Sequence, residues 1–188
     1  MRRMRRITLG LFIALGSLAL GACADTATGP VEAPAAEGLL GGLLGGNTVD
    51  VLHRSVPLAT DEVVTRTIGV YGGVIDLPRA GLTITVPYGA LSAATTITVT
   101  APAGDLMGYH FAPHGLVFKK SVQAKQDLTK SELGLLGKLL ARPTAAYFQG
   151  PLLPQVTALE LLPLNIWGLF GFATFDIRHF SGYVIATD

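Results

Sequence analysis

The fold of this chain is decided by the stretch Ala80-Gly-Leu-Thr-Ile-Thr-Val-Pro-Tyr-Gly-Ala-Leu91 and the run Thr95-Thr-Ile-Thr-Val-Thr-Ala101 that follows it. In both runs, threonine alternates with apolar residues, most of which are β-branched. A period of two in such residues predicts strands with one buried and one solvent-facing side. Glycine and proline bracket each run, which predicts short strands joined by tight turns. We therefore expect an all-β fold, an antiparallel Ig-like β-sandwich.

The same alternation predicts which side chains face the interior. The expected core residues are Leu82, Ile84, Val86, Ile97, Val99, Phe111, Leu116 and Phe118. Further strands are expected before this region, at residues 48–52 and 63–71. Others are expected after it, at residues 122–127, 144–148, 157–161, 172–178 and 181–187. Trp167, in the apolar segment 164–172, is expected in the core, with an interfacial anchor as the alternative.

Three segments of this region resemble the ZU5 domain family. They are Gly72-Gly73, Val86-Pro-Tyr-Gly-Ala-Leu91 and Pro113-His-Gly-Leu-Val-Phe118. The family's usual element is Pro-x-Gly-Ala-Leu, and Tyr88 departs from the second proline or small residue often found there. The resemblance implies a ZU5-like β-sandwich of the kind used in scaffolds and adaptors. It assigns structural roles to Gly89, Ala90, Leu91, Pro113, His114, Gly115 and Phe118.

Residues 1–22 have the pattern of an export signal. Four arginines precede an apolar run at residues 7–20, which is shorter than the roughly 20 residues that span a bilayer. The run ends in Leu20-Gly-Ala-Cys23, which resembles a bacterial lipobox, where cleavage leaves a lipidated cysteine. We expect Cys23 to anchor the protein in the cell envelope, and Ala24 favours the outer membrane if there are two membranes. The alternative is a secretory signal that happens to end in a cysteine.

Removal of that signal would change the net charge. The chain has 14 Lys and Arg against 13 Asp and Glu, and four arginines but no acidic residue lie within residues 1–22. The remainder therefore has 10 basic against 13 acidic residues, a formal charge of −3. Because such a surface lacks the counter-charges that phosphate backbones require, we expect no nucleic-acid partner.

Residues 23–47 are expected to form a flexible tether. They are rich in Ala, Gly, Pro and Thr, and include Gly38-Leu-Leu-Gly-Gly-Leu-Leu-Gly-Gly46. As a coil this segment would span roughly 25–30 Å. Its paired leucines either are incidental to a spacer or dip into the lipid interface. Residues 48–188 are numerous enough for one domain with its own core.

A short inserted helix is expected after residue 128. Thr129-Lys-Ser-Glu132 has the spacing of a capping box, and Pro143 would end the helix. Between them, Leu133, Leu136 and Leu140 fall on one helical face. The helix would either cover one open end of the sandwich or face a membrane or partner.

Little in the sequence indicates metal binding or conventional catalysis. His110 and His114 stand four residues apart, but Pro113 and Gly115 disfavour a helix there. On an extended strand the two side chains would be roughly 13 Å apart, and only a sharp turn at Pro113 would bring them together. The chain has neither a Gly-x-Ser-x-Gly nor a His-Glu-x-x-His motif. We therefore expect no metal, no cofactor and no conventional enzyme activity.

One tripeptide offers an alternative function. In some death-domain adaptors the ZU5 region cleaves itself between Phe and Ser of a His-Phe-Ser sequence, and this chain contains His179-Phe180-Ser181. The resemblance implies attack of the Ser181 hydroxyl on the Phe180 carbonyl, with His179 handling the proton. The same residues also fit an ordinary final strand, in which Ser181 would be inert. The sequence thus leaves two functions: a non-catalytic envelope module that binds an unidentified protein, or a self-processing module.

Overall fold

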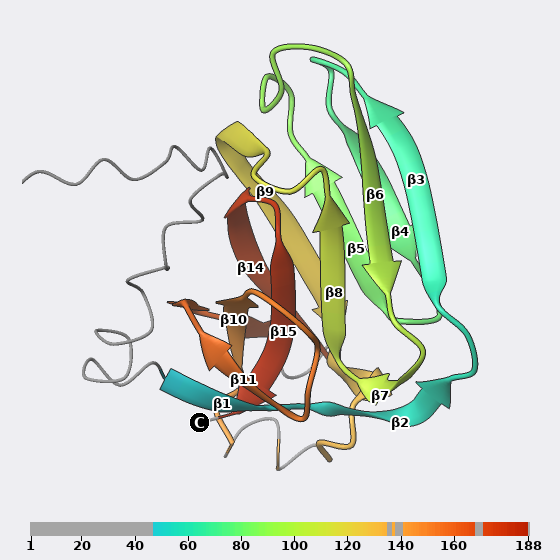
Figure 1. Ribbon diagram of the computed structural model, residues 1–188, viewed down its shortest axis with the longest axis vertical. Helices are drawn as coiled ribbons and strands as arrows, with labels where there is room; N and C mark the ends of the chain where they lie inside the picture. Colours follow the sequence, from blue (N-terminus) through green and yellow to red (C-terminus); the bar gives the residue numbers. More distant parts are fainter. Residues whose placement is uncertain (1–46, 135–136, 138–140, 168–170, 188) are drawn as a thin grey trace, which may run out of the picture. The chain divides into compact units, whose positions relative to one another are not determined.

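The computed structural model describes residues 47–134, 137, 141–167 and 171–187, all within the compact unit Glu37–Asp188 (Figure 1). These residues form antiparallel strands in two main sheets and one small pair, which confirms the all-β prediction. The eight-stranded sheet consists of β1 (Asn47–Val51), β3 (Glu62–Ile68), β6 (Thr95–Ala101), β8 (Gly108–Ala112), β10 (Thr144–Phe148), β11 (Gln155–Ala158), β12 (Glu160–Leu162) and β15 (Gly182–Thr187). The five-stranded sheet consists of β4 (Gly73–Leu77), β5 (Leu82–Val86), β9 (Val117–Asp127), β13 (Asn165–Trp167) and β14 (Phe172–His179). The small pair consists of β2 (His53–Leu58) and β7 (Gly104–Leu106).

The order of strands in each main sheet places late and early segments side by side. The long path of the eight-stranded sheet runs β11-β1-β15-β8-β6-β3, and β10 also pairs with β15. The five-stranded sheet runs β13-β14-β9-β5-β4. β14 and β15, the last two strands described, are therefore interior strands of different sheets.

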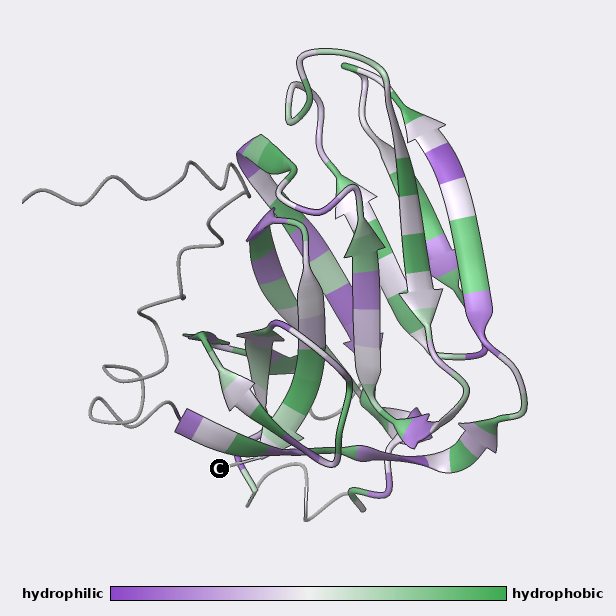
Figure 2. Ribbon diagram, in the orientation of Figure 1, coloured by the Kyte–Doolittle hydropathy of each residue, from purple (hydrophilic) through white to green (hydrophobic). Residues whose placement is uncertain are grey.

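The core lies between the sheets and is built from the predicted alternation. Hydrophobic and polar bands alternate along β6 (Figure 2), with Ile97 and Val99 fully buried. In β5, the apolar positions are buried while Thr85 is exposed. All eight predicted core residues belong to the core cluster or pack against it, with Leu116 only half-buried. The physical reason is the strand period, which sends alternate side chains to one face.

The predicted inserted helix is wrong at its start. Leu128–Lys130 form only a single 3-10 turn, whose N-cap is Asp127. The Asp127 carboxylate accepts hydrogen bonds from the backbone N–H and the hydroxyl of Thr129, so Thr129 is not the cap. Ser131 forms a β-bridge with Arg54, and the Glu132 N–H donates to His53 O, which leaves neither residue free for a helical turn. Residues 135, 136 and 138–140 lie outside the described residues.

The expectation of a core position for Trp167 is also wrong. Its side chain is 52% exposed and stacks on Phe172, with the ring centroids 6.2 Å apart. β13 is the edge strand of the five-stranded sheet, so an outward residue there has no further strand to cover it.

The β3 edge of the eight-stranded sheet carries polar residues. On β3, the Thr65 and Thr67 hydroxyls pair at 2.9 Å with those of Thr98 and Thr96 on β6. Arg66 lies opposite the buried Ile97 in the β3–β6 register, and so points to the core-facing side of the sheet while remaining exposed. An inward-directed charge on an edge strand disfavours pairing with another strand.

Candidate functional site

The His179-Phe180-Ser181 sequence lies where the chain crosses between the main sheets. β14 ends at His179 in the five-stranded sheet, and β15 begins at Gly182 in the eight-stranded sheet. Phe180 and Ser181 form the whole connection. The tripeptide therefore occupies a corner of the sandwich and not the middle of a strand.

Phe180 is fixed on both its side chain and its backbone. Its buried ring packs against Phe111 and Phe118, with centroid distances of 4.9 and 4.7 Å. Its N–H donates to Leu116 O at 2.9 Å, and its carbonyl oxygen accepts from the Gly115 N–H at 3.0 Å. The predicted motif segment 113–118 thus holds both backbone groups of Phe180, and through the Phe180 carbonyl it holds one side of the Phe-Ser peptide.

The two family-motif segments form matching turns. Ala90 N–H donates to Pro87 O at 3.1 Å, and Leu116 N–H donates to Pro113 O at 3.3 Å. The third residue of each turn is a glycine, Gly89 or Gly115, and each has a φ of 75°. A positive φ at this position is the requirement of a type II turn, which explains the glycine in each Pro-x-Gly element. The second residue of each turn, Tyr88 or His114, projects outward and is exposed.

The Ala90-Leu91 end of the first motif is a packing element. Both side chains are buried in the core cluster. The Ala90 carbonyl accepts from the Lys119 N–H at 2.9 Å, which joins the turn to β9. These contacts give Ala90 and Leu91 a role in packing and in joining the turn to the sheet.

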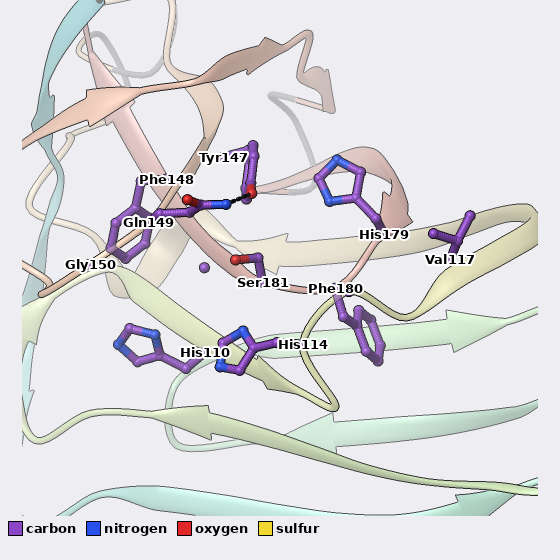
Figure 3. A pocket seen from close by; sticks show the side chains of 12 residues that line it. His110, His114, Val117, Tyr147, Phe148, Gln149, Gly150, His179, Phe180 and Ser181 are labelled. Carbon is purple, nitrogen blue, oxygen red and sulfur yellow. Dashed lines mark hydrogen bonds between the residues drawn. The ribbon is translucent and has the colours of Figure 1, made fainter. Parts of the chain in front are cut away.

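A pocket of about 360 Å³ opens beside the corner (Figure 3). Ser181 lines this pocket, together with His110, His114 and Gln149. Its carbonyl accepts from the Phe111 N–H at 2.9 Å, whereas its hydroxyl has no hydrogen-bond partner among the described residues. Ser181 is only 9% exposed, so a small part of this residue faces the pocket.

His179 is engaged away from the serine. The Tyr183 hydroxyl donates to the His179 carbonyl at 2.6 Å and lies 3.4 Å from the imidazole Nδ1. The His179 Nε2 is 3.5 Å from a Glu160 carboxylate oxygen, and the ring meets that of Tyr147 edge to face at 4.7 Å. In Figure 3 the imidazole and the Ser181 hydroxyl point in different directions. The structure therefore does not pair the His179 imidazole with the Ser181 hydroxyl, although the two residues are only two positions apart in the chain.

The other two pocket histidines lie next to each other. The turn after Pro113 places the His114 ring beside that of His110, as Figure 3 shows. Partial burial, with a contribution from the charge of His114, lowers the pKa of His110. Within the described part of the chain, no group of three or more His, Cys, Asp or Glu residues is placed to hold a metal ion.

A second candidate surface, which the sequence did not reveal, lies on the loops that follow β3 and β5. We call Tyr71, Tyr88 and Lys120 the aromatic tip. Tyr71 is 85% exposed and Tyr88 is 64% exposed, and their ring centroids are 6.2 Å apart. The Lys120 ammonium donates to Tyr88 O at 2.9 Å and lies 5.7 Å from the Tyr88 ring centroid. The Pro-x-Gly turn is the sequence feature that could have revealed this surface, because the second residue of such a turn projects outward.

The remaining predicted site, Cys23, lies outside the described residues, as do the signal and all but the last residue of the tether. Among the residues described, no helix has the length and apolar character needed to cross a membrane. A scan against protein-family models found none that matches this chain, and a search of curated proteins found no match.

Proposed function

We propose that this chain is a lipid-anchored protein of the cell envelope whose ZU5-like β-sandwich binds a protein partner without catalysis. The aromatic tip is the observation that carries the proposal. Exposed tyrosines supply large contact areas at a low entropic cost, and they are enriched at the energetic centres of protein interfaces. Lipid attachment at Cys23 and the ZU5-like assignment rest on the sequence, and the two matching Pro-x-Gly turns support the latter.

The aromatic tip is a better binding surface than the sheet edge. Arg66 and the paired threonines on β3 oppose the addition of a strand to the eight-stranded sheet. By contrast, the loops of the aromatic tip have no such barrier, and the exposed Lys119 and Lys120 adjoin them. A partner that presents an acidic surface with an apolar centre fits this chemistry.

Site-specific photocrosslinking in intact cells tests the proposal. A benzophenone amino acid at position 88 should capture one discrete partner, and the same probe at position 159 should not. Leu159 is a suitable control because it is also exposed, at 57%, but lies on the connection between β11 and β12. Tyr71→Ala should weaken the crosslink formed at position 88. Equal capture from both positions, or none from position 88, would rule out the aromatic tip as the interface.

Self-processing is the second candidate, and one contact favours it. The Gly115 N–H already donates to the Phe180 carbonyl oxygen, where negative charge would develop during attack by Ser181. In that reaction the Ser181 oxygen forms an ester with the Phe180 carbonyl carbon, the Phe180–Ser181 C–N bond breaks, and the hydroxyl proton passes to the nitrogen. Water then hydrolyses the ester. The contacts of His179 with Glu160 and Tyr183 weigh against this candidate, because they hold the imidazole away from the Ser181 hydroxyl and it cannot act as the base.

A further inference from the structure

Arg54 is a buried cation whose hydrogen-bonding groups are only partly used. It lies on β2 and is 2% exposed. Its Nη1 donates to the Leu106 carbonyl, and its guanidinium carbon lies 5.6 Å from the centroid of the Tyr109 ring. Among the described residues, its Nε and Nη2 atoms have no hydrogen-bond partner. Buried guanidinium groups are ordinarily paired with an anion, because an unpaired one is strongly destabilising.

A cavity of about 500 Å³ adjoins this arginine, between β2, the β4–β5 turn and the 3-10 turn. Arg54, Arg79 and Lys130 line it, and no acidic residue among those that the structure describes does. The Glu62 carboxylate accepts from the backbone N–H groups of Arg79 and Ala80 at 3.1 and 2.7 Å, and it lies 3.6 Å from Arg79 Nε, so it offsets the charge of Arg79. The Asp105 carboxylate also feels the charge of Arg54, but its close partner is His53 Nδ1 at 2.8 Å.

The cavity has a fixed shape with one apolar wall. The Ser55 hydroxyl donates to Lys130 O at 3.1 Å, which fastens the 3-10 turn to β2. Residues 56–59 form the wall, which includes the buried Leu58 and the 75% exposed Val56. A ligand that filled this cavity would therefore meet cationic N–H donors at one end and aliphatic carbon at the other.

We infer that this cavity binds a phosphate group attached to an apolar body. Arg54 and Lys130 form no salt bridge among the described residues, and two such cations favour a phosphate over a single carboxylate. The fork of N–H donors in arginine also matches phosphate oxygens. The phosphate belongs either to a free phosphorylated molecule or to the headgroup of a membrane phospholipid. This site is separate from the aromatic tip, which lies at the opposite end of the sandwich (Figure 1).

Binding to octyl phosphate and to inorganic phosphate tests the inference. The full chain carrying Cys23→Ser keeps bound lipid out of the measurement. At constant ionic strength, both probes should raise the melting temperature relative to chloride. Octyl phosphate should bind about tenfold more tightly, as the burial of about two methylene groups would give. The absence of a shift with either probe would overturn the inference.

Three substitutions locate the binding. Arg54→Met should abolish the response to both probes, because it removes the buried donors. Lys130→Ala keeps the core intact and should weaken binding about three- to tenfold, which also covers the case in which Arg54→Met does not fold. Lys119→Ala, an exposed lysine on β9 near the aromatic tip, should bind like the parent protein. Unchanged binding in both Arg54→Met and Lys130→Ala would refute the assignment.

Vesicles identify the source of the phosphate. Retention of the Cys23→Ser protein on phosphatidylglycerol vesicles, but not on those of phosphatidylcholine alone, together with loss in Arg54→Met or Lys130→Ala, would assign the site to a lipid headgroup. Binding of octyl phosphate without vesicle retention would assign it to a free phosphorylated molecule.

Discussion

The Gly115 amide donates a 3.0 Å hydrogen bond to the carbonyl oxygen of Phe180. This contact joins the second Pro-x-Gly turn to the link between the main sheets, and it polarises the one carbonyl that self-processing would require. The same contact is also expected if the chain does not cleave itself, because a buried carbonyl group requires a hydrogen-bond donor.

The mass of the denatured protein distinguishes these two roles. We expect a single uncleaved species, identical in pattern to Ser181→Ala apart from the substitution, because His179 is not paired with Ser181. β15 pairs with β1, β8 and β10, so a fragment that starts at Ser181 would stay bound under native conditions. Denaturant is therefore essential to the measurement. Two masses that sum to the parent plus water, and that disappear in Ser181→Ala, would establish cleavage instead.

Phe118→Ala should cost about 3–5 kcal/mol of unfolding free energy. The Phe118 ring is buried and meets the Phe180 ring edge to face at 4.7 Å, so its removal leaves a cavity in the core. The neighbouring Val117 is 72% exposed, and Val117→Ala should change stability by less than about 0.5 kcal/mol. Urea unfolding of the two variants provides the comparison. Similar midpoints would mean that the strand faces are assigned the wrong way round.

Alkaline pH should destabilise the fold through Tyr109. Burial raises the pKa of Tyr109 to about 12, whereas the same phenol in the unfolded chain ionises near pH 10. Because the unfolded state releases its proton first, the unfolding free energy falls as the pH rises through this interval. Burial also raises the pKa of Tyr183.

Absorbance at 295 nm should show the two buried tyrosines ionising at a higher pH than an unperturbed phenol, whose pKa is about 10. Tyr109→Phe should reduce the loss of stability above pH 10. A native titration with no tyrosine component above the range of an unperturbed phenol would contradict the buried environments of Tyr109 and Tyr183.

Cys23→Ser should move the protein from the membrane fraction to the soluble fraction, because it removes the residue expected to carry lipid. Fractionation followed by immunoblotting measures this, and Ala24→Ser provides a control that leaves the cysteine in place. If the Cys23→Ser protein still sediments with membranes, the anchor must lie elsewhere, with the leucine-rich segment 38–46 the first candidate.

The sequence predicted the strands best where burial follows a strict period of two. Leu82, Ile84 and Val86 show this period, and they are buried as expected. The helix prediction was wrong at its start because the capping pattern at Thr129 is local, whereas the backbone of Ser131 and Glu132 is used by β2, a partner some 80 residues earlier in the chain. Periodicity cannot report such long-range pairing.

The sequence predicted one of the candidate sites in part and gave no indication of another. The His-Phe-Ser motif was visible, but its position at a corner depends on which sheet each flanking strand joins. Arg54 gave no signal because an arginine in a strand-like stretch is ordinarily exposed. Its burial follows from the packing of β2 against β7 and the 3-10 turn, which no local pattern encodes.

The positions of β14 and β15 have a consequence for how the protein acquires its structure during synthesis. Each is an interior strand of a different sheet, yet both come after all the other described strands in the chain. Until residues 172–187 are present, β9 lacks one neighbour in the five-stranded sheet, and β8 is separated from β1 and β10 in the other. The sandwich therefore cannot close progressively as the chain grows. During synthesis the two sheets of this domain therefore stay incomplete until residues 172–187 have emerged.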